Sequence, residues 1–310
     1  MEAIVCQELT RRYGAVTGLD GLNMIVPEGR VFGFLGPNGA GKSTTLRILA
    51  TLTHPTTGDA WIAGASIRSK ADRIRHALGY MPQELAFPGW MRGQDFLEYA
   101  AALSEVPSGE RRARAAEMLD FVGLTGAAKR RIRGYSGGMK GRLGLAQALI
   151  HRPAVALLDE PAATLDPLGR RDILQLIAGL RNTTTVVLSS HILDDIDRVC
   201  DEVAILDGGR LIAQDTTVGL KDRYVQPAFA VEVAEDPAPL IRTLAAQPWV
   251  AEVSAAGSAV QVRARSRIQA ERGLPRLVLD AGYTLLRYEP VAPSLEDVFV
   301  RLIRPTREEA

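Results

Sequence analysis

The chain has 310 residues, of which 46% are hydrophobic and 24% charged, the ordinary composition of a folded protein of roughly two domains. Its net charge of +1 gives no bulk electrostatic reason to expect nucleic acid or an anionic membrane as a partner. Cys6 and Cys200 form no metal-binding spacing and fit a reducing, cytosolic setting. There is no visible signal peptide and no apolar run of the roughly 18 residues that a membrane span needs, so another chain would have to supply any span.

The run from residue 36 to residue 44 fits the phosphate-binding pattern G-x-x-x-x-G-K-[ST]. It follows a predicted buried strand, Val31–Leu35, and precedes leucines at helical spacing in residues 45–52. Glycines let backbone N–H groups form an anion-binding nest, and the helix start adds its positive dipole end. We therefore expect a nucleoside triphosphate, with Lys42 at the β- and γ-phosphates and the Ser43 hydroxyl on Mg²⁺. The predicted nucleotide-contacting residues are Gly36, Asn38, Gly39, Ala40, Gly41, Lys42, Ser43 and Thr44.

The stretch from about residue 94 to residue 133 is helical in pattern throughout and indicates a helical insertion in an α/β domain. Its predicted apolar stripes are Phe96, Leu97, Ala100 and Leu103, followed by Met118, Leu119 and Val122. A basic cluster ends the stretch. It could indicate nucleic acid, but a solvated surface fits a nearly neutral chain better. The cluster is Lys129, Arg130, Arg131 and Arg133.

Ser136 precedes a helix predicted over residues 138–150, where its hydroxyl would stand at the helix N-terminus. Gly137 and Gly138 expose backbone N–H groups at the same point, so this segment predicts a second anion site. A simple capped helix is the alternative. One α/β domain rarely needs two triphosphate loops unless the second serves a neighbouring subunit.

Two adjacent acids, Asp159 and Glu160, follow an apolar run at 155–158 that predicts a strand. Open α/β sheets bind ligands at the carboxyl ends of their strands. Asp159 would help to hold Mg²⁺, and Glu160 would orient or deprotonate a water molecule. Alone, such a pair usually marks a surface turn, but the glycine loop upstream favours the catalytic interpretation.

Further along, β-rich runs alternate with helical patterns, which predicts a parallel sheet covered on both faces. The predicted strands are 155–158, 186–190 and 203–206, and the predicted helices are 138–150, 169–180 and 192–199. Gly208 and Gly209 predict a hairpin turn after the last strand. Pro227, soon after Tyr224, marks a boundary between a nucleotide-binding domain at 1–224 and an accessory domain at 225–310.

The accessory domain has the predicted order β-α-β-β-α-β plus one helix, which indicates a small α+β, ferredoxin-like domain. The predicted strands are 229–234, 250–254, 259–263 and 283–288, and the predicted helices are 239–247, 266–281 and 295–302. Residues 255–258 would join the two middle strands. By fold analogy alone, such a domain could serve as a small-molecule sensor or a dimerisation module.

Taken together, the motifs resemble those of the ATP-binding-cassette (ABC) ATPases over about residues 4–220, in the family's order and with its usual spacing. The matching segments are the glycine loop, Gln83 as the glutamine loop, 135–139 as the signature, 157–161 as the acidic strand, 163–166 as the D-loop, and His191 as the switch histidine. Tyr13 falls where the family has an aromatic residue that stacks on adenine. Tyr135 replaces the first Leu of the signature, and Ala-Ala-Thr at 162–164 replaces Thr-Ser-Gly. Neither departure removes a phosphate ligand.

The resemblance implies a P-loop NTPase (RecA-like) core with a helical subdomain at about 86–150, which binds and hydrolyses ATP with Mg²⁺. It places Ser43, Gln83 and Asp159 on the metal ion. It implies that Glu160, His191 and Gln83 are the catalytic residues. In that arrangement His191 would contact the γ-phosphate and stabilise transition-state charge, while Gln83 would also contact the attacking water.

In the family, two nucleotide domains clamp two ATP molecules head to tail, which implies a homodimer or heterodimer. The residues that this places at the nucleotide across the dimer interface are Ser136, Gly137, Gly138 and Asp166. Closure and hydrolysis would move a separate integral membrane permease, which implies a location at the cytoplasmic face of the membrane. Phe87 or Trp90 is expected to line the cleft for the permease's coupling helix.

The sequence Pro-Ser-Leu-Glu-Asp-Val-Phe at 293–299 resembles the C-terminal motif of daunorubicin-resistance-type ATPases, which work with ABC-2 exporters. It implies export of a drug, antibiotic, lipid or other amphipathic molecule. The alternative is a soluble ABC ATPase that acts on nucleic acid or the ribosome. The chain shows no long coiled coil, zinc-ligand cysteines or second cassette, so no nucleic-acid partner is expected. A P-loop kinase is a third interpretation, which the second anion site opposes.

Overall fold

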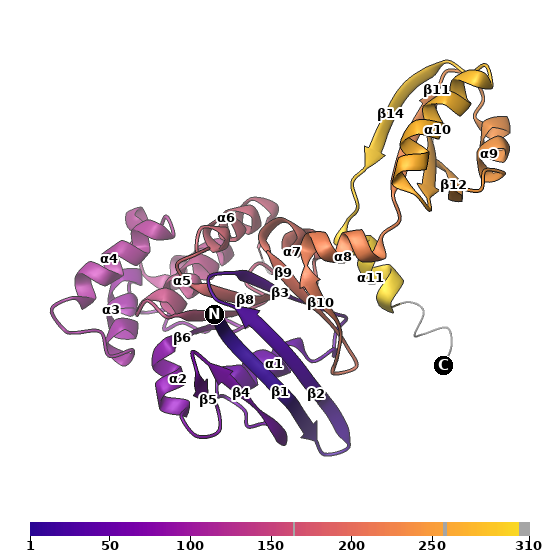
Figure 1. The fold of residues 1–310 in the computed structure, drawn as a ribbon. Coiled ribbons are helices and arrows are strands. Elements are labelled where there is room, and N and C mark those ends of the chain that lie inside the picture. The colour runs from indigo at the N-terminus through magenta and orange to yellow at the C-terminus, as the bar shows by residue number, and fades with distance from the viewer. Residues whose placement is uncertain (164, 257–258, 304–310) are drawn as a thin grey trace. The chain divides into compact units, whose positions relative to one another are not determined.

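The computed structural model describes residues 1–163, 165–256 and 259–303 (Figure 1). These form two compact units, Met1–Thr217 and the chain from Val218 onward. Thr164 of the predicted D-loop and residues 257–258 of the predicted turn lie outside the described residues, as does the end of the predicted accessory domain at 304–310. The predicted domain limits stay a prediction. Within the described part of the chain, no helix combines the length and apolar character of a membrane span.

A six-stranded sheet organises the first unit, in the order β10-β9-β3-β8-β7-β6. Its strands are β3 (Val31–Leu35), β6 (Leu78–Met81), β7 (Val155–Asp159), β8 (Thr185–Ser189), β9 (Glu202–Asp207) and β10 (Arg210–Thr216). All neighbours are parallel except β9 and β10, which form the predicted hairpin. Every residue of β3, β7 and β8 is buried, which explains why these strands are continuous apolar runs.

Helices cover both faces of this sheet, as predicted. They include α1 (Lys42–Leu49), α6 (Pro167–Ala178) and α7 (Leu193–Val199). The core on one face combines Leu46 and Leu49 of α1 with Phe32 and Phe34 of β3. Helix α7 packs on β3, and α6 and α7 lie on the opposite side of the sheet from α1 (Figure 1).

A second, antiparallel sheet near the N-terminus was not predicted from the sequence. Its order is β2-β1-β4-β5, from β1 (Glu2–Tyr13), β2 (Val16–Pro27), β4 (Thr57–Ile62) and β5 (Ala65–Ser66). Its buried residues, among them Ile4, Leu9 and Leu22, share the core with α1. This sheet carries Tyr13 at the end of β1 and so presents it beside the glycine loop.

The helical insertion is less regular than its sequence pattern indicates. It contains α3 (Gly93–Leu103), α4 (Arg111–Phe121), the short 3-10 helices η1 (Thr125–Ala127) and η2 (Ile132–Gly134), and α5 (Gly137–Leu149). The prediction that residues 94–133 are helical throughout is wrong, because turns interrupt them at 104–110 and after α4. Leu103, predicted on the apolar stripe, is 67% exposed, whereas the other stripe residues are buried. The basic cluster is exposed, as expected of a solvated surface.

Two helices remain to be placed in the chain. Helix α2 (Ala71–Ala77) lies between β5 and β6, and α8 (Thr217–Tyr224) follows β10. The second unit then continues through β11 (Ala228–Val233), α9 (Ala238–Ala245), β12 (Val250–Ala256), β13 (Ala259–Ala264), α10 (Arg267–Asp280), β14 (Leu285–Val291) and α11 (Leu295–Ile303).

The second unit has the predicted ferredoxin-like topology. Its sheet has the order β12-β13-β11-β14, and all neighbouring strands are antiparallel. Each βαβ half therefore encloses a strand of the other half, which is the split βαβ arrangement. The unit has its own core, in which Phe229 and Val231 of β11 pack with Leu240 of α9 and Leu274 of α10.

Candidate active site

The glycine loop connects β3 to α1 at the carboxyl edge of the parallel sheet. Helix α1 begins at Lys42, directly after Gly41, whose φ of 105° is in the left-handed region that favours glycine. At Gly36 a Cβ atom would lie 2.3 Å from the carbonyl oxygen of Leu206, so only glycine fits there. A Cβ at Gly39 would have no neighbour within 4 Å, so the tip of the loop faces open space. Asn38 and Gly39 are exposed, and Ala40 is buried.

Lys42 lies over this loop. Its Nζ donates to the carbonyl oxygens of Gly36 at 2.7 Å and Pro37 at 3.1 Å. Burial lowers the pKa of Lys42, and the negative charges of Glu160 and Asp159 oppose that change. The side chain therefore brings a positive charge to the glycine loop, beside the two acids.

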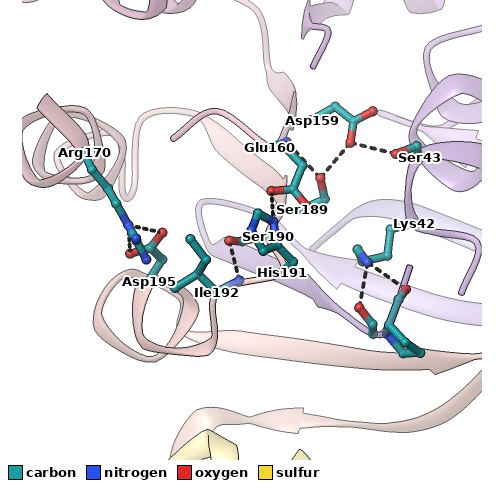
Figure 2. Close-up of polar contacts among 12 residues, drawn as sticks. Lys42, Ser43, Asp159, Glu160, Arg170, Ser189, Ser190, His191, Ile192 and Asp195 are labelled. Atoms are coloured by element: carbon teal, nitrogen blue, oxygen red, sulfur yellow. Dashed lines mark hydrogen bonds and ion pairs between the residues drawn. The ribbon is translucent and has the colours of Figure 1, made fainter. Parts of the chain in front are cut away.

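The structure brings Ser43 and Asp159, two of the predicted Mg²⁺ ligands, into contact. Ser43 Oγ donates to Asp159 Oδ1 at 3.0 Å, and Ser189 Oγ donates to the same oxygen at 2.7 Å (Figure 2). The other carboxylate oxygen, Asp159 Oδ2, is buried and has no hydrogen-bond partner in the described structure. Asp159 is only 1% exposed, and an unpartnered buried carboxylate oxygen is costly. A cation at this oxygen would remove that cost.

Glu160 turns away from Asp159 and towards His191. Its φ of 51° is uncommon for a residue other than glycine, and its backbone N–H donates to Ser189 Oγ at 2.9 Å. Glu160 Oε2 lies 2.8 Å from His191 Nδ1 (Figure 2). The Glu160 side chain is 10% exposed and that of His191 is 52% exposed, so the histidine forms the open side of the pair.

Ser189 is the residue of this site to which sequence analysis gave no role. It is fully buried at the end of β8 and joins the two acids, because it donates to Asp159 and accepts from Glu160. The signal was a serine at the carboxyl end of a buried strand, two residues before the switch histidine. Asp159 and Ser189 are register partners of neighbouring parallel strands.

Gln83 and Tyr13 lie less centrally. Gln83 is exposed and follows β6, and in the described structure it makes no hydrogen bond to Ser43 or Asp159. Tyr13 is partly exposed, with the guanidinium carbon of Arg11 at 4.5 Å from its ring centroid. A Cβ at Gly18 would lie 3.0 Å from the Tyr13 ring and 3.5 Å from Thr44, so the ring lies near the glycine loop.

The signature and D-loop residues both cap helices. Ser136 Oγ accepts from the Met139 N–H at 3.3 Å at the start of α5, and a Cβ at Gly138 would meet nothing within 4 Å. Asp166 Oδ1 accepts from the Gly169 N–H at 2.9 Å at the start of α6. Both roles are those expected of N-cap residues. Their contacts with a second subunit stay a prediction.

Tyr135, which replaces the usual Leu of the signature, has a clear structural reason. Its ring is buried, and its hydroxyl donates to the carbonyl oxygen of Ala127 at 2.8 Å. A Cβ at Gly93 would lie 2.2 Å from the Tyr135 oxygen, so glycine at the start of α3 makes room for the larger ring. Burial raises the pKa of the Tyr135 hydroxyl.

The fold and the loop geometry define an ATP-binding P-loop ATPase of the ATP-binding-cassette class. Residues 19–163 match the family described as ABC transporter. The chain is 36% identical over 308 residues to the daunorubicin resistance ATP-binding protein DrrA2 of Streptomyces coeruleorubidus, which covers 97% of this chain and 94% of that protein. It is 36% identical over 295 residues to the Nod factor export ATP-binding protein I of Ralstonia nicotianae, with 95% and 91% covered. The chain belongs to the ABC transporter ATP-binding proteins.

Solved structures agree with this assignment. A dimeric post-hydrolysis state of the ATP-binding cassette MJ0796 bound to ADP and Pi superposes with a TM-score of 0.63 and 25% identity, and covers 69% of this chain and 98% of that chain. The predicted P-loop NTPase fold and ABC ATPase class are therefore confirmed. The roles of individual site residues are not settled by this likeness and remain proposals.

Proposed function

We propose that the chain is the ATP-hydrolysing subunit of an exporter whose membrane-spanning permease is a separate protein. Its cargo would be a drug, antibiotic, lipid or other amphipathic molecule. The observation that carries the proposal is the similarity to the daunorubicin resistance and Nod factor export proteins over 97% and 95% of this chain. The similarity extends through the second unit, beyond the nucleotide-binding core. These relatives give no support to the alternative of action on nucleic acid or the ribosome.

The donor set at the carboxyl edge of the sheet fits Mg²⁺. A bound Mg²⁺ would neutralise phosphate charge, and it typically takes one or two carboxylates, hydroxyls and phosphate oxygens. The unpartnered Oδ2 of Asp159 and the Ser43 hydroxyl are such ligands. Gln83, exposed after β6, is the third proposed ligand and would have to swing towards them. No group of three or more His, Cys, Asp or Glu side chains that could hold a metal ion occurs in the described ranges.

Hydrolysis would depend on Glu160 and His191. Lys42 and the loop N–H groups would hold the phosphates. The Glu160 carboxylate, whose charge acts on Lys42, would then orient a water molecule and accept its proton. His191 Nδ1 lies 2.8 Å from this carboxylate and fixes its direction. Because His191 is half exposed, its imidazole would also be available to the γ-phosphate and stabilise transition-state charge. Tyr13 would stack on adenine, and its exposed ring leaves room for that.

A head-to-tail homodimer or heterodimer would complete the site. The exposed Ser136 and Gly137, at the start of α5, can meet the phosphates of a second subunit. Phe87 packs edge-on against Phe96 with ring centroids 5.2 Å apart, whereas Trp90 is 74% exposed. Of the two residues predicted to meet the permease, Trp90 is therefore the better candidate. Docking there would hold the subunit at the cytoplasmic face of the membrane.

The C-terminal motif at 293–299 is a helix start in the structure. Ser294 Oγ accepts from the Asp297 N–H at 3.2 Å, and Asp297 Oδ2 accepts from the Ser294 N–H at 3.1 Å. These reciprocal bonds form a capping box at α11. Leu295 and Val298 of the motif are buried. The motif therefore has a folding role beside any role in assembly.

The test is purification of the tagged, full-length Glu160→Gln protein from detergent-solubilised native membranes with ATP and Mg²⁺. Recovery of one integral membrane protein in fixed ratio would support the proposal. Lys42→Ala, which should not hold ATP tightly, is the matched control. Reconstituted with that membrane protein, the wild-type chain should drive ATP-dependent movement of an amphipathic fluorescent drug. Recovery with ribosomes or nucleic acid instead would overturn the proposal.

A further inference from the structure

Two helices that begin directly after the site's loops are joined by an ion pair whose carboxylate is buried. Helix α6 begins one residue after Asp166, and α7 begins two residues after His191. Arg170 Nε, in the first turn of α6, lies 2.8 Å from both Oδ1 and Oδ2 of Asp195 in α7 (Figure 2). Neither residue belongs to the nucleotide-contacting set described above.

The surroundings of this pair separate it from an ordinary surface ion pair. The side chains of Arg170 and Asp195 are 27% and 7% exposed. Exposed pairs contribute little because water screens them, whereas a buried carboxylate needs its partner. The Nε–H of Arg170 is shared between both carboxylate oxygens, and a hydrogen bond between two charged groups is stronger than one between neutral groups. The pair therefore holds the starts of α6 and α7 in one arrangement.

Backbone contacts connect each member of the pair to a site loop. The Arg170 N–H donates to the carbonyl oxygen of Asp166 at 2.9 Å. On the other side, the Asp195 N–H donates to the carbonyl oxygen of Ile192 at 3.2 Å, and the Ile192 N–H donates to Ser190 Oγ at 3.0 Å. The segment that these bonds order contains His191, whose Nδ1 meets Glu160.

We propose that Arg170 and Asp195 are positioning residues for hydrolysis. Through the pair, the loop that ends at Asp166 and the loop that carries His191 keep one relative position, which keeps His191 Nδ1 on the Glu160 carboxylate. This inference rests on the proposed function, because it assumes that Glu160 and His191 act on ATP. It assigns neither Arg170 nor Asp195 a contact with ATP.

The chain contains a matched control just beyond the C-terminal ends of the same two helices. Arg181, just after α6, lies with its Nε 3.0 Å from Oδ1 of Asp201, just after α7. These side chains are 36% and 21% exposed. Asp201 also accepts from the N–H of Val31, the first residue of β3, so this pair lies at the opposite edge of the sheet from the glycine loop. Arg170→Gln and Arg181→Gln thus remove the same kind of pair at the site end and the far end.

The experiment compares these two variants of the full chain with Asp195→Asn, Arg170→Lys and wild type. Steady-state ATPase kinetics, ATP affinity and thermal unfolding are measured for each. Arg170→Gln and Asp195→Asn should lower kcat roughly ten- to hundredfold with KM and ATP affinity nearly unchanged, since misplaced catalytic groups cost that much. Arg170→Lys should recover part of kcat. Arg181→Gln should lower the unfolding temperature but leave kcat close to wild type.

A double variant, Arg170→Gln with Asp195→Asn, should be no slower than either single variant if the residues act as a pair. The inference is wrong if Arg170→Gln keeps wild-type kcat, or if both glutamine variants lower kcat equally. If Arg170→Gln does not fold, the same kcat measurements on Arg170→Lys and Asp195→Asn test the inference. Wild-type kcat in Asp195→Asn would then contradict it. Wild-type turnover by Glu160→Gln would instead contradict the proposed function, and that result does not depend on any variant of the pair.

Discussion

At the scale of single residues, the two adjacent acids contact different side chains. Asp159 is the last residue of β7 and is directed to Ser43, whereas the left-handed φ of Glu160 turns its carboxylate to His191. The sequence predicted both acids and Lys42, because they belong to contiguous motifs. It could not predict the part of Ser189, because that contact depends on the register between β7 and β8.

Replacing the Glu160 carboxylate should separate closure from chemistry. Glu160→Gln keeps the side chain's shape and removes a negative charge near the phosphates, so ATP should bind at least as well. Loss of a general base typically costs a factor of about 10²–10⁴ in rate. The variant should accumulate as an ATP-loaded dimer in size-exclusion chromatography with ATP and Mg²⁺. Asp159→Asn, which weakens Mg²⁺ binding, should not. If Glu160→Gln hydrolyses ATP like wild type, His191 or Gln83 must take the larger role.

Removing the Ser189 hydroxyl should raise the Mg²⁺ concentration at which the ATPase rate is half-maximal. In Ser189→Ala, Asp159 Oδ1 keeps only the Ser43 donor and the Glu160 N–H loses its acceptor. Such unsatisfied buried groups cost about 1–3 kcal/mol, so the unfolding temperature should also fall. ATPase rates measured across a Mg²⁺ titration test this. Ser66→Ala removes a comparable bond to Asp59, 2.6 Å long, in the antiparallel sheet, and should leave the titration unchanged. An unaltered midpoint in Ser189→Ala would contradict the prediction.

At the scale of elements, the strands and helices with a regular hydrophobic pattern were the ones that the sequence predicted. The parallel strands are buried throughout, and their apolar runs indicated them correctly. Strand β1 has register shifts between Cys6 and Arg11, and these irregularities break the alternation that would have predicted the antiparallel sheet. In the helical insertion, Pro107 lies in the turn between α3 and α4, and Gly123, at φ 66°, follows the end of α4.

The contact between α3 and the signature segment can be tested at Gly93. In Gly93→Ala the new Cβ would lie 2.2 Å from the Tyr135 oxygen, so the ring must move and its bond to Ala127 is lost. Overpacking of this kind costs about 1–3 kcal/mol. Thermal unfolding should show the loss. Gly126→Ala, where a Cβ would meet nothing within 4 Å, is the control.

A second substitution should repair the first, because a shorter side chain makes room for the added methyl group. Gly93→Ala combined with Tyr135→Leu should recover much of the unfolding temperature lost by Gly93→Ala alone. The interpretation of Tyr135 as the partner of Gly93 would be wrong if Gly93→Ala were as stable as Gly126→Ala.

At the scale of the whole molecule, each of the two compact units has a hydrophobic core. The residues of the candidate site lie within Met1–Thr217, whose core joins the parallel and antiparallel sheets. The second unit has a separate core between its sheet and helices α9 and α10. The order of elements was enough to predict the ferredoxin-like topology, because few arrangements of β-α-β-β-α-β bury one face of every element. The proposed role of this unit in assembly could not be predicted from the order of elements.

Deleting the chain after Tyr224 should therefore leave nucleotide binding largely intact, because the glycine loop, both acids and His191 remain with their core. The deletion should weaken assembly with a second subunit or the permease, since the similarity to exporter ATPases includes the removed unit. ATP affinity and the thermal unfolding of the shortened chain test the first part, and co-purification with the permease tests the second. Because Leu220 of α8 is buried, a second deletion after Thr217, where the first unit ends, is the control. If both shortened chains fail to fold or to bind ATP, the two cores are not independent and the domain boundary is misplaced.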